Sequence, residues 1–331
     1  MTARISVNEI VTAGRIIDVR SPSEYAQGHI PGSVNLPLLT DEGRAVVGTL
    51  YKQQGAQAAY LKGVELTGPR LAGLIQQGQK ISLGSPGIYC WRGGLRSQIF
   101  STLLDWANVK TSILSGGYKA FRRWVLEKFQ ISYSLKVLGG MTGVGKTSIL
   151  KELARRGEQV IDLEALSSHR GSAFGLSIDT SQPSNEHFEN LLAVALHSQD
   201  ISRPIWIEDE SRMVGHCKIP DAFFSQIEEA ELYEIAIPSE ERLERLLVDY
   251  GNLPTEYLKE SVLRLHKRLG GVRTKNILCQ LHEGKMRDAA GQLMDYYDKM
   301  YARSLDRRKP SRKIFYGEGW SREKWVEMLL R

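Results

Sequence analysis

Two glycine-rich loops in this chain carry residues that could do chemistry on anions. The first, residues 90–97, holds one cysteine, two glycines and two arginines. The second, residues 140–147, has the pattern Gly-x4-Gly-Lys-Thr, in which backbone N–H groups wrap around phosphate oxygens. Together they indicate a reaction that needs both a reactive sulfur and a bound phosphate or diphosphate.

The first loop should place Cys90 between a strand and a helix. Residues 87–89 form a short apolar stretch, and residues 97–106 have the apolar spacing of a helix. Backbone N–H groups of such a loop bind anions, and the helix dipole and nearby arginines favour the thiolate form of a cysteine. We therefore expect a catalytic role for Cys90, Arg92 and Arg96, and phosphate binding by Gly93 and Gly94.

The second loop has the elements that a phosphate-binding P-loop needs. An apolar strand at residues 134–138 precedes it, and a helix is expected over residues 148–155. Lys146 would supply positive charge for catalysis, and the Thr147 hydroxyl is placed to bind Mg²⁺. The strand at residues 205–207 ends in three acids, of which Glu208 or Asp209 is the expected outer ligand of that metal. The residues expected to bind phosphate are Gly140, Thr142, Gly143, Val144, Gly145, Lys146, Thr147 and Ser148.

A third polar segment leaves two readings open. Residues 162–165 and 169–175 follow the second strand of the P-loop region. In small-molecule P-loop kinases this place faces the acceptor, but the segment also fits an ordinary polar loop. A P-loop binds a phosphate chain and does not by itself imply ATP hydrolysis.

The N-terminal part resembles the rhodanese (sulfurtransferase) fold. The resemblance is carried by residues 17–20, 24–25 and 28–33, and by a cysteine that follows a central strand. It covers roughly residues 4–130 and implies structural roles for Asp18 and Arg20. The Cys-x5-Arg spacing departs from the shorter sulfurtransferase loop and has the loop length of rhodanese-fold and tyrosine phosphatases. Such a loop has room for a tetrahedral oxyanion.

Nearly the whole chain, with its last twenty or so residues matching least, resembles the tRNA 2-selenouridine synthase family through residues 48–53, 89–97, 116–120 and 208–212. The resemblance implies an α/β protein with a rhodanese-like domain at 1–130 and a P-loop NTPase-like α/β domain at 131–331 with a basic helical C-terminal part. It implies a transferase that acts on wobble 2-thiouridine of tRNA. Geranyl diphosphate would first give an S-geranyl intermediate, and selenophosphate would then supply selenium. No covalently bound cofactor is expected, and Mg²⁺ is the expected ion.

The charge distribution suits an RNA partner. The net charge is +6, and residues 264–275 contain five Lys or Arg and no acid. Residues 299–313 contain seven Lys or Arg and one Asp. Solvated helix faces would also account for such clusters, but polyanions bind through phosphate neutralisation. The residues expected to contact tRNA are Arg264, Lys267, Arg268, Arg273, Lys275, Arg307, Arg308 and Lys309, with Arg312 and Lys313 as further candidates.

Composition excludes some classes and leaves rivals. No apolar run approaches the roughly 20 residues that span a bilayer, so no membrane partner is expected. Three distant cysteines argue against a disulfide framework, and a reducing cytoplasm is the expected location. Cys217 and Cys279 are expected to be bystanders. The alternatives are an ATP-dependent small-molecule kinase fused to a sulfurtransferase, a regulatory module with an inactive rhodanese domain, and a phosphatase.

Overall fold

The structure is a computed structural model that describes residues 2–81, 84–169, 181–251, 253–305 and 312–331. The chain divides into two compact units, Met1–Phe129 with Ser184–Val194, and Gln130–Pro183 with Ala195–Arg331. Residues 184–194, which the sequence analysis assigned to the second domain, thus pack with the first unit. Within the described residues, no helix is both long and apolar enough to cross a membrane.

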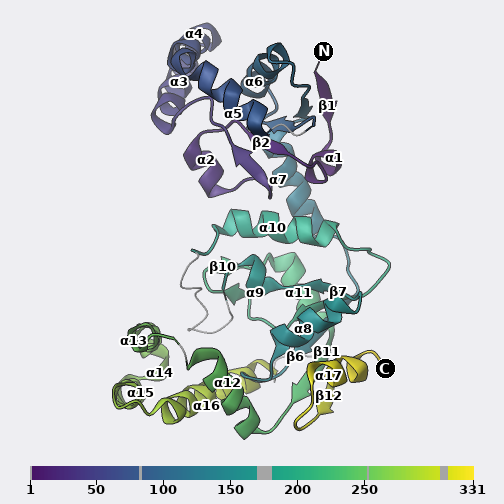
Figure 1. Cartoon of the computed structure of the whole chain (residues 1–331), viewed down its shortest axis with the longest axis vertical. Coiled ribbons are helices and arrows are strands. Elements are labelled where there is room, and N and C mark those ends of the chain that lie inside the picture. Colours follow the sequence, from purple (N-terminus) through teal and green to yellow (C-terminus); the bar gives the residue numbers. More distant parts are fainter. Residues whose placement is uncertain (1, 82–83, 170–180, 252, 306–311) are drawn as a thin grey trace. The chain divides into compact units, whose positions relative to one another are not determined.

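The first unit is built on a five-stranded parallel sheet in the order β1-β5-β4-β2-β3 (Figure 1). β4 (Gly87–Tyr89) is the central strand, fully buried, and pairs with its neighbours through Gly87↔Ser112 and Ile16↔Gly87. Parallel strands need crossovers, which helices supply here. The other elements are β1 (Ala3–Ile5), α1 (Val7–Val11), β2 (Ile16–Asp18), α2 (Pro22–Gln27), β3 (Ser33–Asn35), α3 (Asp41–Gln54), α4 (Ala56–Thr67), η1 (Gly68–Arg70), α5 (Leu71–Ile81), α6 (Leu95–Trp106), β5 (Ser112–Leu114) and α7 (Gly117–Lys128).

The second unit contains another five-stranded parallel sheet, in the order β12-β11-β6-β8-β7. β6 (Leu135–Gly139) is central and pairs with β8 through Leu135↔Ile205. The remaining elements up to β11 are α8 (Lys146–Arg155), β7 (Gln159–Ile161), α9 (Leu163–Leu166), α10 (Asn185–His197), β8 (Ile205–Glu208), β9 (Met213–Val214), β10 (Cys217–Lys218), α11 (Asp221–Glu229) and β11 (Glu231–Ala236). α10 belongs to the first unit up to Val194.

The C-terminal part is mostly helical, as expected, and has its own apolar core. That core includes Leu258, Val262, Ile277 and Leu293. The expectation was wrong for residues 312–316, which form an edge strand paired in parallel with β11. The elements are α12 (Ser239–Tyr250), α13 (Thr255–Arg264), α14 (His266–Leu269), α15 (Gly271–His282), α16 (Met286–Leu305), β12 (Arg312–Tyr316) and α17 (Arg322–Leu329).

The helices after the two loops begin earlier than the apolar spacing predicts. α6 starts at Leu95 rather than residue 97, and α8 starts at Lys146 rather than residue 148. In both cases a glycine, Gly94 or Gly145, is the N-cap. Apolar spacing marks only the buried face, so polar residues of a first turn escape it. The consequence is that the first turns of α6 and α8 belong to the loops' chemistry.

Candidate functional site

Cys90 is the residue directly after the central strand β4, and its side chain is only 4% exposed. Its Sγ lies 3.3 Å from the Oγ of Ser97. Burial opposes ionisation of the thiol, but hydrogen bonds from the hydroxyl and backbone of Ser97 and the backbone of Arg92, together with the charge of Arg96, hold the pKa of Cys90 below its ordinary value. The predicted nucleophile therefore has surroundings that favour its thiolate.

The Ser97 hydroxyl has one hydrogen and two partners. Its Oγ lies 2.9 Å from the carbonyl oxygen of Gly94 as well as 3.3 Å from the Cys90 sulfur. When Cys90 is a thiol, Ser97 can donate to Gly94 and accept from the sulfur. When Cys90 is a thiolate, the hydroxyl must turn to donate to it. Ser97, which sequence reasoning did not name as a site residue, thus couples the loop to the charge of Cys90.

Arg96 is held by a carboxylate from α2. Its Nη1 lies 2.8 Å from Oε2 of Glu24, which also lies 3.6 Å from Nε of Arg44. Burial raises the pKa of Glu24, but the hydrogen bond and charge of Arg96 outweigh it and leave that pKa below its ordinary value. Glu24 also forms a capping box with Ser21 at the start of α2. The sequence predicts this helix start but not the contact between Glu24 and Arg96. The Arg92 side chain is exposed.

Close backbone packing shapes the Cys90 loop. Gly93 has a φ of +63°, and a Cβ there would lie 2.3 Å from the carbonyl oxygen of Leu114. Gly117 has a φ of +60°, and its Cβ would lie 2.3 Å from the nitrogen of Gly93 and 2.4 Å from the carbonyl oxygen of Cys90. The N–H of Tyr118 donates to that same carbonyl at 2.9 Å. These two glycines are therefore required by packing, and phosphate binding by Gly93 and Gly94 stays a prediction.

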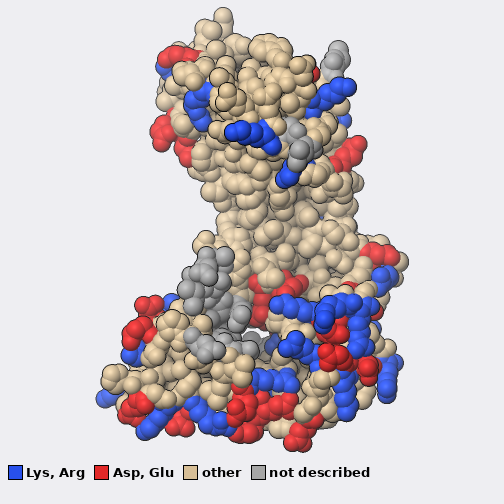
Figure 2. All heavy atoms as spheres, in the orientation of Figure 1, with Lys and Arg blue, Asp and Glu red and all other residues tan. Residues whose placement is uncertain are grey.

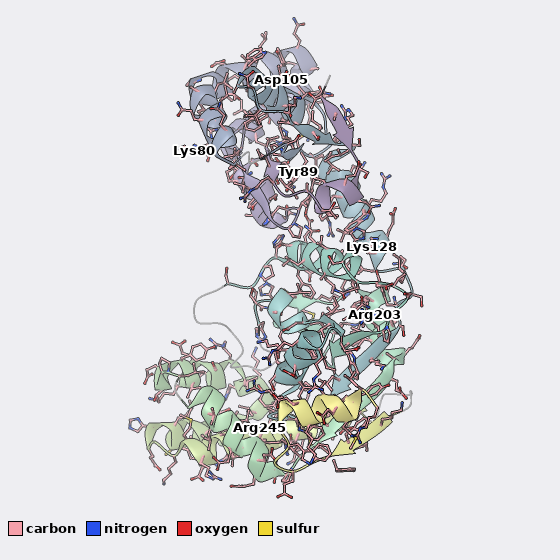
Figure 3. The ribbon with its side chains drawn as sticks, turned by 45° about the vertical axis from the view of Figure 1, so that its right-hand side comes forward. Lys80, Tyr89, Asp105, Lys128, Arg203 and Arg245 are labelled. Atoms are coloured by element: carbon pink, nitrogen blue, oxygen red, sulfur yellow. The ribbon has the colours of Figure 1, made fainter. Side chains whose placement is uncertain are left out.

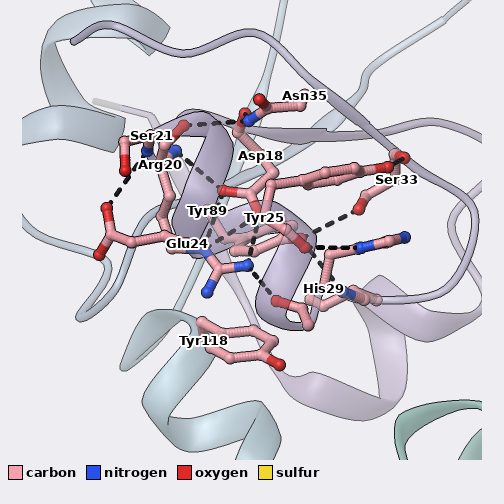
Figure 4. Close-up of polar contacts among 12 residues, drawn as sticks. Asp18, Arg20, Ser21, Glu24, Tyr25, His29, Ser33, Asn35, Tyr89 and Tyr118 are labelled. Atoms are coloured by element: carbon pink, nitrogen blue, oxygen red, sulfur yellow. Dashed lines mark hydrogen bonds and ion pairs between the residues drawn. The ribbon is translucent and has the colours of Figure 1, made fainter. Parts of the chain in front are cut away.

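A buried ion pair lies beside this loop at the end of β2 (Figure 4). Nη2 of Arg20 lies 2.6 Å from Oδ2 of Asp18, and the two side chains are 1% and 0% exposed. The guanidinium also donates to the carbonyl oxygen of Gly28 at 2.7 Å and lies over the ring of Tyr118, 3.7 Å from its centroid. Because the two buried charges pair with each other and the guanidinium also has a carbonyl and an aromatic ring as partners, both residues fit the structural role expected of them.

The P-loop joins the central strand β6 to α8. Gly140, Gly143 and Gly145 have φ values of +143°, +87° and +86°, a region that favours glycine. The Nζ of Lys146 donates to the carbonyl oxygen of Gly140 across the loop at 3.2 Å. The hydroxyl of Ser148 donates to the carbonyl oxygen of Gly145 at 2.7 Å. Lys146 is thus folded over the ring of backbone that would surround a phosphate.

Three carboxylates gather near Thr147. One oxygen from each of Glu164, Glu208 and Glu210 lies within 4.8 Å of the others, and the Thr147 hydroxyl donates to Oε2 of Glu164 at 3.0 Å. Of the residues expected to bind Mg²⁺, Glu208 belongs to this group and Thr147 contacts it through Glu164, whereas Asp209 is not part of it. Metal binding stays a prediction. β8 ends at Glu208, and the N–H of Glu210 donates to the carbonyl oxygen of Glu208 at 3.0 Å, so a tight turn brings Glu210 beside Glu208. Glu164 was not predicted.

The electrostatics of this group fit a divalent cation. Burial and the charges of Glu164 and Glu210 raise the pKa of Glu208 well above its ordinary value. Burial raises the pKa of Glu210 to about 7. The charges of Glu164 and Asp209 act in the same direction, and the charge of Lys146 opposes them. Oε2 of Glu208 is buried and has no hydrogen-bond partner among the described residues. Since oxygen atoms are the ligands that Mg²⁺ prefers, the three glutamates and the nearby threonine hydroxyl fit it.

Two arginines of α12 hold the P-loop backbone. Nη1 of Arg242 donates to the carbonyl oxygen of Thr142 at 3.1 Å, and Nη1 of Arg245 donates to that of Val144 at 2.7 Å. Arg245 is labelled in Figure 3. Arg242 also forms two hydrogen bonds of 2.8 Å with Asp298 of α16. Sequence reasoning missed both arginines, because they lie about 100 residues from the loop on a helix of ordinary amphipathic pattern.

The predicted RNA-binding residues are only partly described. Four of them have exposed side chains and one is half-buried, in α13 to α15 or in the turns between. Nη2 of Arg264 donates to the Ser261 hydroxyl at 2.6 Å. Residues 307–309 lie outside the described residues. The exposed ones are Arg264, Lys267, Arg268 and Lys275, and the half-buried one is Arg273.

The two further basic candidates are paired within the sheet. Arg312 and Lys313 lie on β12, where Arg312 forms an ion pair with Glu234 and Nζ of Lys313 lies 3.0 Å from Glu231. Their charges are therefore balanced by their own neighbour strand, which weakens the expectation that they meet a polyanion. Figure 2 shows Lys and Arg side chains interspersed with Asp and Glu on one face of this unit.

The two other cysteines have surroundings unlike those of Cys90. Cys217 is buried, and burial raises its pKa to about 11. Cys279 is exposed, and its Sγ lies 3.2 Å from Oε1 of Glu283, which raises its pKa. Of the three thiols, only that of Cys90 has its pKa lowered.

Comparison with known proteins places both halves of the chain. Residues 133–330 match the family model described as tRNA 2-selenouridine synthase AAA domain, and residues 4–123 match the rhodanese-like domain. A relative called tRNA 2-selenouridine synthase from Shewanella oneidensis is 34% identical over 97% of this chain and 94% of its own length. Relatives of the same name from Shewanella denitrificans and Nitrosomonas europaea are 35% and 40% identical, over 95% and 71% of this chain and 94% and 63% of their own lengths. The α/β fold class is thereby confirmed, and the chain belongs to the tRNA 2-selenouridine synthase family.

Proposed function

We propose that this protein is a transferase that converts wobble 2-thiouridine of tRNA to 2-selenouridine through an S-geranyl-2-thiouridine. Its co-substrates would be geranyl diphosphate and selenophosphate. The names of its relatives support the tRNA substrate and the selenium product. The observation that carries the proposal is the presence in one chain of an activated Cys90 in an oxyanion-sized loop and a P-loop with a lysine and three carboxylates.

The first step would take place at the P-loop. The sulfur on C2 of the base attacks C1 of geranyl diphosphate, the carbon–oxygen bond breaks, and the diphosphate leaves with the electron pair while the base loses its N3 proton. Lys146 and the backbone N–H groups at the start of α8 stabilise the charge that grows on the diphosphate. When bound by Thr147 and the three glutamates, Mg²⁺ would neutralise part of the same charge.

The second step would take place at the Cys90 loop. The selenium of selenophosphate attacks C2, and geranylthiolate leaves with its electron pair. Water then cleaves the selenium–phosphorus bond and releases phosphate. Alkylation in the first step makes the sulfur a better leaving group, which explains why two steps are needed. The Cys-x5-Arg loop suits the phosphate end of the donor, and Cys90 and Arg96 serve this step.

Nucleoside mass spectrometry tests both steps in order. Purified protein is incubated with 2-thiouridine tRNA and geranyl diphosphate, and then with selenophosphate. The wild type should add a geranyl mass and then exchange sulfur for selenium. Lys146→Ala should lose the first step, Cys90→Ala only the second, and Cys279→Ala neither. Unchanged tRNA together with ATP consumption would contradict the proposal and favour a kinase fused to a sulfurtransferase.

A further inference from the structure

A cavity lined almost wholly by apolar side chains lies in the second unit. The cavity opens to solvent on one side, and its lining is almost free of polar surface. Helices α12, α13, α15 and α16 form its walls, and one residue of the P-loop completes them. Representative lining residues are Thr142, Leu247, Leu258, Leu281, Ala290 and Met294.

Hydrogen bonds hold the walls of this cavity to the P-loop. Thr142 lines the cavity and lies between the first two glycines of the loop. Its carbonyl oxygen accepts from Arg242 of α12, which in turn is paired with Asp298 of α16. The hydroxyl of Tyr301, also on α16, accepts the N–H of Gly140 at 2.8 Å. These hydrogen bonds therefore hold the cavity next to the backbone of the P-loop.

The apolar lining of the cavity favours an apolar ligand over a polar one, among the ligands that could extend from a P-loop. A nucleoside carries a base and a ribose, whose polar groups need hydrogen-bond partners when they are buried. Among the described residues that line the cavity, none is charged, and only Thr142 and Tyr297 have polar side chains. A hydrocarbon chain needs no such partner and gains free energy from the burial itself.

We propose that this cavity binds the hydrocarbon chain of a prenyl diphosphate whose diphosphate lies on the P-loop. The identity of the ligand rests on the function proposed above, and the cavity identifies where its hydrocarbon chain would bind. Cavity size then selects chain length. Ala290 of α16 is a position where a larger side chain would fill the space, and Met294 is one where a smaller side chain would extend it.

Calorimetric binding of geranyl diphosphate and inorganic pyrophosphate tests the assignment without requiring catalysis. Burial of one methylene changes affinity about fourfold, so burial of four carbons should make geranyl diphosphate bind about 250-fold more tightly than pyrophosphate. Ala290→Leu should weaken geranyl diphosphate at least tenfold and leave pyrophosphate unchanged. Asp295→Leu adds the same side chain at an exposed position of the same helix and should change neither affinity.

Equal affinities of the wild type for the two ligands would overturn the proposal. A second result would also overturn it. In that result Ala290→Leu weakens binding of geranyl diphosphate and pyrophosphate equally, and Met294→Ala does not improve binding of the longer farnesyl diphosphate relative to geranyl diphosphate. The outcomes separate the two claims. Tight, Ala290-sensitive binding without alkylation of tRNA leaves the cavity assigned and refutes the function. Alkylation of tRNA that is unaffected by Ala290→Leu supports the function and refutes the cavity.

Discussion

Replacing Gly117 by alanine should impair selenium transfer and spare geranyl transfer. The added Cβ would lie 2.3 Å from the nitrogen of Gly93, whereas real Cβ atoms stay at least 3.0 Å from such neighbours. The Cys90 loop must therefore move by about 0.7 Å, the difference between the two distances. A misplacement of about 1 Å at a reacting group costs on the order of 100-fold in rate. We expect selenium transfer to slow by about 10- to 100-fold.

Gly32→Ala is the matched control for this variant. Gly32 lies in the same unit with a φ of +79°, and nothing lies within 4 Å of an added Cβ. Both variants carry the cost of a left-handed alanine, about 1–2 kcal/mol, but only Gly117→Ala displaces the loop. The assay is single-turnover conversion of S-geranyl-2-thiouridine tRNA by selenophosphate, with geranyl transfer and urea unfolding measured in parallel. Equal loss of selenium transfer in the two variants would refute the reasoning.

Three further outcomes follow from the site. Asp18→Asn leaves the buried charge of Arg20 without its partner and should lower the free energy of unfolding by about 3–5 kcal/mol, whereas the double change of Asp18 and Arg20 to leucine should cost less. Urea titration measures both, and an equal cost would count against the pairing. Cys90 should become thiolate at lower pH than Cys279, because its pKa is lowered and that of Cys279 is raised. Iodoacetamide labelling, followed for each cysteine by mass spectrometry across pH, should give separate midpoints, and coincident ones would contradict the assignment. Mg²⁺ at about 100 times its Kd should stabilise the wild type by about 2.7 kcal/mol, and Glu208→Gln should remove most of that gain in thermal unfolding. Stabilisation retained by that variant would argue against the glutamates as ligands.

The positions of the two loops could be predicted because their pattern is local. A short apolar strand, a glycine-rich turn and a helix are contiguous in the sequence, so Cys90 and Lys146 were placed at the right junctions. The acids after β8 show the limit of this reasoning. The tight turn after β8, which brings Glu210 rather than Asp209 beside Glu208, is not visible in the sequence, and nothing near these acids points to Glu164, which lies 44 residues away from its hydrogen-bond partner Glu208.

The residues that sequence reasoning missed act across long separations. Arg242 and Tyr301 reach the P-loop from helices that begin about 100 and 150 residues later, and their own helices have ordinary composition. The ion pairs of two basic C-terminal residues, Arg312 and Lys313, escaped sequence reasoning for a related reason. A run of like charges gives no sign of its partners in the sequence, but Arg312 lies on an edge strand beside β11, and Glu234 of β11 forms an ion pair with it.

Each of the two units has a glycine-rich loop at the equivalent position of its own sheet, but the two loops differ in residue type. In each, the loop follows the central strand of a five-stranded parallel sheet and ends at the first turn of a helix. Ligands of parallel sheets bind at this edge, where loops and helix N-termini supply N–H groups. At β4 the strand is followed at once by Cys90, whose pKa is held below its ordinary value. At β6 the loop is longer, and it carries Lys146, whose charge acts on Glu210 of the three-carboxylate group. Each unit therefore has a candidate anion-binding loop, and in the function proposed above the residue types assign selenium transfer to the Cys90 loop and departure of the diphosphate to the P-loop.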